Sequence, residues 1–108
     1  MTPTEKQIAV AELAGWSRED IERGCSLGQF GETVPCYRND RDAIIEVCER
    51  VLTEPERLAY VRELVVVCEP RLRGVIFGLD AGRGWWLANA TAEQRVDALL
   101  ITKGILKP

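Results

Sequence analysis

The side chains that most often carry acid–base or nucleophilic chemistry are scarce in this sequence. No histidine occurs among its 108 residues, so the commonest general base is missing. Serine occurs only at Ser17 and Ser26, and neither lies in a G-x-S-x-G turn. Among the carboxylates, Asp40 and Asp42 come nearest to a paired acidic site, but helix capping explains both. We therefore predict no enzyme and no catalytic residues, with a hydrolase that uses carboxylates and a metal as a further alternative.

The four cysteines are the only soft metal ligands in the chain. Ten, eleven and nineteen residues separate Cys25, Cys36, Cys48 and Cys68 in turn, so no C-x-x-C pair exists. A structural zinc site normally uses ligands paired at short spacing. We expect no metal site and no cofactor. We expect Cys48 and Cys68 to be core residues of helices, because a free thiol packs as a small hydrophobe.

Binding chemistry is better represented, by arginines that stand near tryptophans. Arg83 lies beside Trp85 and Trp86, and Arg71 and Arg73 precede them. Arginine next to an aromatic face can hold a protein surface or a planar ligand through stacking and cation–π contact. Adjacent residues of a strand face opposite sides, so one tryptophan would face the core and the other would face solvent, another layer or a partner. The predicted partner-binding site therefore consists of Arg71, Arg73, Arg83, Trp85 and Trp86.

A β-hairpin would position this site. Residues 75–79 are rich in β-branched and aromatic side chains, residues 85–87 are apolar, and a glycine-containing loop joins the two runs. A lone hairpin is marginal, so it must pack on helices or on further strands. The sequence thus predicts an α+β fold of about four helices with a small antiparallel sheet built around a hairpin at residues 75–87, in an α-β-α-like packing.

N-capping signals mark where the helices begin. Thr2, Thr53 and Thr91 each open a T-x-x-E or T-x-x-Q capping box, and Asn39 or Asp40 caps a further helix. The helices that follow positions 40 and 53 have a very short connection. We therefore expect these two helices to pack directly on each other as an αα-hairpin.

Weaker signals describe the rest of the chain. Gly24, Gly28 and Gly31 indicate a loop whose spacing does not match a phosphate-binding loop. Residues 33–37 are predicted to be extended at a sheet edge, since Pro35 cannot donate to a ladder. The helix after position 53 is expected to bury one stripe, formed by Leu58, Val61, Leu64, Val65 and Cys68.

Charge and hydropathy limit the classes of partner. The net charge is −3, with −6 in residues 1–70 and +3 in residues 71–108, so the chain is not the strongly basic domain that nucleic acid requires. The longest strongly apolar run, residues 64–68, is far too short to span a membrane, and the N-terminus has no secretory signal. We expect a single cytosolic domain at residues 1–108, with neither nucleic acid nor membrane as its partner.

Three segments resemble small proteins of tailed phages and prophages. Residues 8–16, IAVAELAGW, are similar to an IAEALGW-like start in those proteins. Residues 34–43, VPCYRNDRDA, and 90–100, ATAEQRVDALL, are similar to their segments VPDYLNDLNA and ATAEQRAEAFL. By the order of these motifs the chain resembles the phage ABA sandwich domain family, whose name denotes an α-β-α arrangement. Residues 75–87 and the 24–31 loop depart from the pattern.

The resemblance implies a phage or prophage origin, and hence a place in the host cell cytosol. It brings no catalytic residues, because the family has no established set. Under it we expect a non-enzymatic binding protein that acts on a host protein, as a counter-defence or host-takeover inhibitor would. The alternative is a sponge that sequesters a nucleotide second messenger in an oligomeric pocket, so a homo-oligomer stays open.

Overall fold

The computed structural model describes residues 1–27, 34–72 and 88–107. Its elements are α1 (Pro3–Leu13), α2 (Arg18–Leu27), α3 (Arg41–Val51), α4 (Glu54–Cys68), the short 3-10 helix η1 (Pro70–Leu72) and α6 (Ala92–Thr102). The described chain is all-helical and contains no strand, so the predicted α+β fold class with its antiparallel sheet is wrong. The hairpin expected at residues 75–87 lies outside the described residues.

The predicted helix starts are confirmed. At Thr2 and Thr91 each threonine hydroxyl accepts the N–H three residues later, and the side chain at that position accepts the threonine N–H, at distances between 2.9 and 3.2 Å. At the start of α4 the Glu56 carboxylate accepts the Thr53 N–H at 2.9 Å. Asp40 caps α3 by accepting a first-turn N–H at 3.1 Å. These starts were readable because each depends on side chains within one turn.

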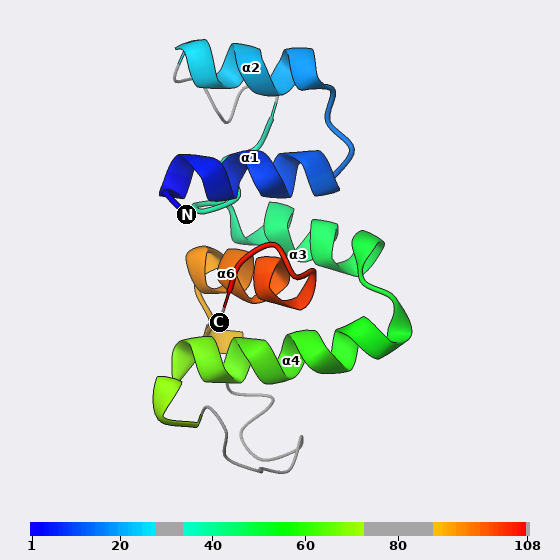
Figure 1. Cartoon of the computed structure of the whole chain (residues 1–108), viewed down its shortest axis with the longest axis vertical. Coiled ribbons are helices and arrows are strands. Elements are labelled where there is room, and N and C mark those ends of the chain that lie inside the picture. Colours follow the sequence, from blue (N-terminus) through cyan, green and yellow to red (C-terminus); the bar gives the residue numbers. More distant parts are fainter. Residues whose placement is uncertain (28–33, 73–87, 108) are drawn as a thin grey trace.

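Helix α6 lies at the centre, between α1 and α3 on one side and α4 on the other (Figure 1). Its residues Val96, Leu99 and Leu100 are fully buried. α3 and α4 meet at their junction, where Arg57 donates to the Glu49 carbonyl at 3.1 Å, but they do not pack along their lengths. The expected αα-hairpin is therefore wrong. Because α6 is apolar on more than one face, it buries more surface when it lies between other helices.

The buried face of α4 differs from the predicted stripe. Leu58 is 51% exposed, whereas Tyr60, which the stripe left out, is 7% exposed. Leu64 and Val65 are buried as expected. The second half of α4 is apolar almost all round, so its sequence has no sharp phase, and contact with α6 selects the covered face. None of the helices within the described ranges is both long and apolar enough to cross a membrane.

Helix α2 extends the molecule at one end, where α1 is its only packing partner among the described elements (Figure 1). The capping spacing of Ser17 and Asp20 predicts the start of a short helical turn, and the Asp20 N–H donates to the Ser17 hydroxyl at 3.1 Å, which confirms that start. The helix continues through Gly24, so the loop predicted to begin there is wrong at that residue, while Gly28 and Gly31 lie outside the described residues. A single glycine inside a helix costs only about 1 kcal/mol, which packing on α1 can offset.

A side chain of α1 holds the segment at residues 34–37. Gln7, 3% exposed, donates from Nε2 to the Pro35 carbonyl at 2.6 Å and accepts the Tyr37 N–H at 2.9 Å. The described part of this segment, residues 34–37, contains a bend and the start of a turn and no strand, so the predicted sheet edge is wrong there. Gln7 satisfies the backbone groups that a neighbouring strand would otherwise have bonded.

Helices α1 and α6 are each followed, after one C-cap residue, by a glycine with positive φ, which is 92° at Gly15 and 75° at Gly104. The turn at Gly104 folds the chain back, so that the N–H groups of Ile105 and Leu106 both donate to the Leu100 carbonyl, at 2.9 and 3.1 Å. Leu106 then packs against the core, and Ile105 stays 44% exposed.

The C-terminal end of α6 is fastened to the α3–α4 junction by one lysine. Lys103 Nζ donates to the Val51 carbonyl at 2.8 Å and pairs with the Glu56 carboxylate at 3.0 Å. The Thr53 N–H, and after it Lys103, lower the pKa of Glu56 from 4.5 to about 2. Glu56 therefore links the start of one helix to the end of another.

We expect this link to give the protein a defined acid sensitivity. Since the folded-state pKa of Glu56 is depressed, its contribution is fully present above the ordinary carboxylate range and is lost as the pH falls toward about 2. Glu56→Gln keeps an acceptor for the Thr53 N–H but loses the charge that pairs with Lys103. Urea unfolding at a series of pH values should show the variant less stable than the parent near neutrality, with the difference closing below about pH 4. A difference that is independent of pH would contradict this assignment.

Candidate binding site

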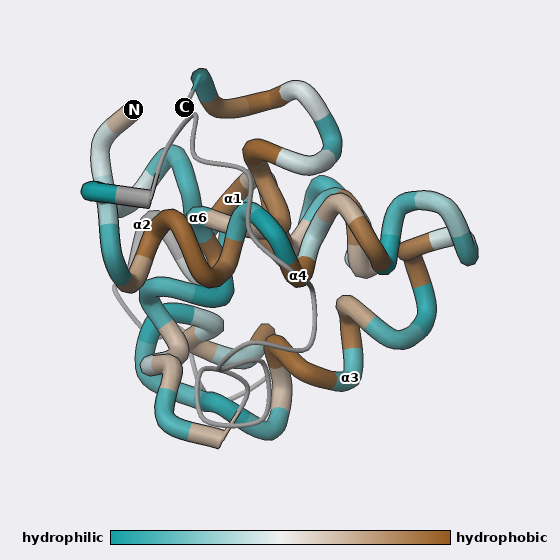
Figure 2. The backbone as a smooth tube through the Cα atoms, turned by 90° about the horizontal axis from the view of Figure 1, so that it is seen from below, coloured by the Kyte–Doolittle hydropathy of each residue, from teal (hydrophilic) through white to brown (hydrophobic). Residues whose placement is uncertain are grey.

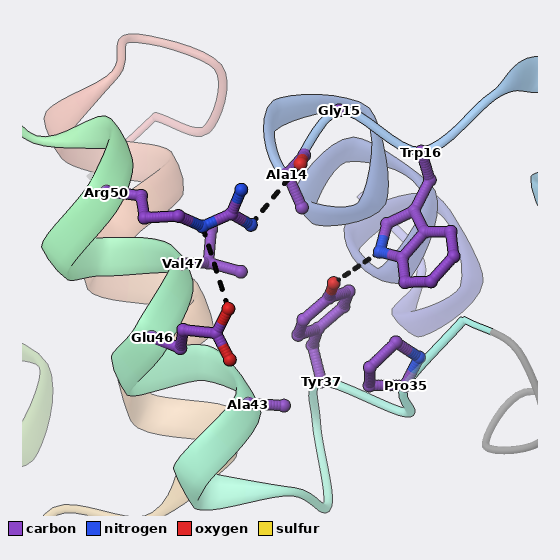
Figure 3. Close-up of a pocket in the computed structure, with 9 residues that line it drawn as sticks. All are labelled: Ala14, Gly15, Trp16, Pro35, Tyr37, Ala43, Glu46, Val47 and Arg50. Atoms are coloured by element: carbon purple, nitrogen blue, oxygen red, sulfur yellow. Dashed lines mark hydrogen bonds and ion pairs between the residues drawn. The ribbon is translucent and has the colours of Figure 1, made fainter.

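A pocket of about 310 Å³ opens between the end of α1, the exposed side of α3 and the segment at residues 34–37 (Figure 3). Its walls combine aromatic, small apolar and charged side chains, contributed by Ala14, Gly15, Trp16, Pro35, Tyr37, Ala43, Glu46, Val47 and Arg50. The volume is at the small end of the range of ligand pockets, which suits one side chain or one ring system. We call this feature the α1–α3 pocket.

Two aromatic residues form one wall of the α1–α3 pocket. Trp16 Nε1 donates to the Tyr37 hydroxyl at 2.8 Å (Figure 3). The positive-φ turn at Gly15 places Trp16, and Gln7 places Tyr37 through its backbone N–H. Because each aromatic residue is held at its backbone and at its polar end, the wall is set before any ligand arrives.

The Tyr37 hydroxyl accepts one hydrogen bond and still has a proton to donate. Burial raises the pKa of Tyr37, and the hydrogen bond from Trp16 and the charge of Arg50 oppose that rise. The hydroxyl therefore keeps its proton at neutral pH. It accepts from Trp16, and among the described residues no acceptor takes its own proton. A ligand with an acceptor atom could fill that role.

Arg50 supplies the charge at the mouth of the pocket. Its Nη2 donates to the Ala14 carbonyl at 3.3 Å, and its Nε lies 3.7 Å from the Glu46 carboxylate (Figure 3). The Arg50 side chain is 53% exposed, so part of the guanidinium still faces solvent. These two contacts restrict the guanidinium while leaving donors for a ligand.

The structure places only part of the predicted partner-binding site. Arg71 lies in η1 and is exposed, and its guanidinium makes two hydrogen bonds to the Glu69 carboxylate, at 2.8 and 2.9 Å. It does not line the α1–α3 pocket. Arg73, Arg83, Trp85 and Trp86 lie outside the described residues.

Sequence reasoning missed the α1–α3 pocket because its residues come from three separate segments. The sequence predicts that Trp16, which follows the helix-ending Gly15, packs on the core, and that Glu46 and Arg50, four residues apart on a helix, form a pair on its outer face. That pair is confirmed, but the face it occupies is the rim of a pocket. The local signal for the pocket was Trp16 directly after the helix-ending Gly15, because a large aromatic side chain at a turn packs against the neighbouring segments.

The cysteines of the described chain differ sharply in accessibility. Cys48 is buried, and burial raises the pKa of its thiol to about 11 against smaller opposing effects of Tyr60 and Arg95. Cys68 is half-buried on α4, and Cys36 is half-buried in the segment after Pro35. Cys48 is thus a core residue, as predicted, and its thiol is a poor nucleophile.

We expect alkylation of the folded protein to be slower at buried Cys48 than at half-buried Cys36. Treatment with iodoacetamide near pH 8 should modify Cys48 about a hundredfold or more slowly than Cys36, because Cys48 combines burial with a raised pKa. Peptide mapping by mass spectrometry over time measures both rates in one sample. In urea the two rates should converge. Equal rates in the folded state would contradict the placement of Cys48.

No family model matches the chain, and no curated protein or solved structure matches it at a significant level. The resemblance to the phage ABA sandwich domain family therefore stays a prediction from the three motifs. Within the described ranges, no group of three or more side chains of metal-binding type could hold a metal ion.

Proposed function

We propose that this chain is a non-enzymatic binding protein that holds a side chain of a partner protein in the α1–α3 pocket. One observation carries the proposal: Trp16, Tyr37 and Arg50 line the same pocket. Tryptophan, tyrosine and arginine are the residue types most enriched among those that dominate the affinity of protein interfaces. They do so when binding removes them from water near the centre of an interface, and here all three line one small pocket that an anchor side chain could fill.

The chemistry of the α1–α3 pocket indicates which anchor it would take. The aromatic wall and the small residues Ala43 and Val47 favour an apolar or aromatic body. The Tyr37 hydroxyl and the free donors of Arg50 favour an acceptor oxygen on that body. An anchor such as a tyrosine side chain meets both requirements, and its contacts need no proton transfer.

A partner protein accords better with this site than a nucleotide does. A nucleotide second messenger carries phosphate charge, and Arg50, the only cation among the described residues that line the pocket, is paired with Glu46. Residues 1–70, which supply the whole lining, sum to −6. If the phage resemblance holds, the partner is a host protein in the host cytosol, and inhibition of that protein is the biological role.

The test compares two arginines that are alike except for the pocket. Arg50 and Arg57 have side chains 53% and 52% exposed, and each donates to a main-chain carbonyl and pairs with a glutamate. Peptides selected on the immobilised parent protein from a random display library are then titrated against both alanine variants. Arg50→Ala should weaken binding about 30-fold, as loss of a 2 kcal/mol contact does, and Arg57→Ala should leave it within about twofold.

One further variant and a nucleotide panel separate the alternatives. Trp16→Phe keeps an aromatic ring but removes the N–H that holds Tyr37, so it should also weaken binding, and circular dichroism checks that each variant folds. Selected peptides that bind Arg50→Ala as tightly as the parent would overturn the proposal. Calorimetric binding of a cyclic nucleotide that disappears in Arg50→Ala would replace it with the nucleotide sponge.

A further inference from the structure

A second surface runs along α1, on the side that also meets the C-terminal turn. It is a groove of about 500 Å³ formed mainly by apolar residues, and its lining consists of Met1, Glu5, Ile8, Ala9, Glu12, Leu13 and Ile105. We call it the α1 groove. In Figure 2 a hydrophobic stretch of the tube, followed by a hydrophilic residue, precedes the end marked C, and Met1 and Ile105 line the same groove. No residue of this groove lines the α1–α3 pocket.

The α1 groove gathers apolar side chains that remain in contact with water. Met1 and Ile105 are 49% and 44% exposed, and the only other large apolar side chain so exposed in the described chain is Leu58, which does not line the groove. The left-handed turn at Gly104 leaves Ile105 on this surface, although the next residue packs inward. Apolar groups gathered in one concave surface, rather than scattered singly, indicate an interaction site.

The charged side chains of the α1 groove are both acidic, although the α-ammonium group of Met1 also acts on Glu5. Glu5 and Glu12 lie seven residues apart, about 10 Å along the helix, and among the described residues no lysine or arginine lines the groove. Lys6, the only lysine or arginine of α1, pairs with Asp97 of α6 at 2.8 Å instead. Glu12 is exposed and makes no ion pair in the described chain. The groove therefore presents an apolar floor with an acidic margin.

The acidic margin disfavours a second copy of this chain as the occupant. If two copies met groove to groove, antiparallel pairing would set Glu5 against Glu12, and parallel pairing would set each carboxylate against its own kind. Both arrangements bring like charges together while water is excluded, which is unfavourable. A partner with positive charge at the edges of an apolar face removes this conflict.

We propose that the α1 groove docks an amphipathic helix of a partner protein whose apolar face is flanked by lysine or arginine. A helix laid along α1 would bury its apolar side chains against Ile8, Leu13 and Ile105. Its flanking cations would lie beside Glu5 and Glu12. The inference is independent of the α1–α3 pocket, because it depends on different residues.

The test uses two labelled synthetic helices with leucines at identical positions and either lysine or glutamate elsewhere. Fluorescence anisotropy measures their binding to the parent chain and to single variants. We expect the leucine–lysine helix to bind and the leucine–glutamate helix to bind at least about tenfold more weakly. Ile105→Ser should weaken binding of the leucine–lysine helix about tenfold, and Leu58→Ser, at an equally exposed leucine outside the groove, should not change it.

Charge is tested separately. Glu12→Gln should weaken binding about threefold at low salt and less at high salt, whereas Glu49→Gln, an exposed carboxylate on α3, should have no comparable effect. Arg50→Ala should bind the leucine–lysine helix as tightly as the parent does. A failure of the α1 groove proposal is therefore distinguishable from a failure of the α1–α3 pocket proposal. Equal binding of both helices, or equal loss in Ile105→Ser and Leu58→Ser, would overturn the proposal. So would a dimer in sedimentation velocity that Ile105→Ser dissociates.

Discussion

Replacing Leu99 with alanine is expected to lower the free energy of unfolding by about 2–5 kcal/mol. Leu99 is fully buried on α6, the helix that contacts α1, α3 and α4. The loss has two parts: the transfer free energy of the removed methyl and methylene groups, and the cavity that remains between three helices. Because α6 packs against three other helices, a shift of one helix would close such a cavity only in part.

Urea unfolding followed by circular dichroism measures this loss, and Leu58→Ala provides the matched control. Leu58 is 51% exposed, so the same chemical change there should cost within about 0.5 kcal/mol. A small domain has a total stability of about 5–15 kcal/mol, so Leu99→Ala would use a large part of it. If the two leucine variants were equally stable, α6 could not be the central helix.

Replacing Gln7 with alanine is expected to cost about 2–4 kcal/mol, which is unusually large for a polar residue. Gln7 makes two hydrogen bonds to the segment at residues 34–37, through the Pro35 carbonyl and the Tyr37 N–H. Without the amide, both backbone groups lose their described partner, and the buried Tyr37 N–H can reach water only if the segment moves. The substitution should therefore affect both stability and the pocket.

Two measurements separate these effects. Urea unfolding gives the stability, with Glu12→Ala as a control at an exposed position of the same helix, expected to change it by less than about 0.5 kcal/mol. Hydrogen exchange of the Trp16 indole N–H reports on the pocket, since that proton is bonded to Tyr37 in the parent. Faster exchange of this proton in Gln7→Ala than in Glu12→Ala is expected. Unchanged exchange would show that Gln7 does not position Tyr37.

The local parts of the fold were predictable from the sequence. The capping boxes at Thr2, Thr53 and Thr91 mark helix starts because their hydrogen bonds span only three residues. The glycines at positions 15 and 104 mark helix ends, since they adopt a positive φ that other residues avoid. The Glu46–Arg50 pair on one face of α3 was also predictable, because its two residues are only four positions apart on a helix.

The fold class was not predictable, because residues with a local preference for strands adopt other structures when long-range contacts favour them. Residues 33–37 have strand character, yet in the described part of this segment Gln7 bonds the backbone that a ladder would have bonded. Residues 65–67 are β-branched, yet they belong to α4, whose packing on α6 outweighs the β preference. Strand propensity is a weak signal, and long-range contacts decide it in both places.

By itself, then, the sequence determined where most of the helices begin, which residues of α3 and α6 are apolar, and that none of the 108 residues is a histidine. Only the tertiary structure decided that α6 separates α3 from α4, that Tyr60 rather than Leu58 is buried, and that Trp16, Tyr37 and Arg50 share a pocket. The physical reason is the sequence separation of the residues that interact. Caps, turns and helix faces depend on neighbours within about four residues, whereas an order of packing or a pocket depends on which distant surfaces bury the most apolar area together.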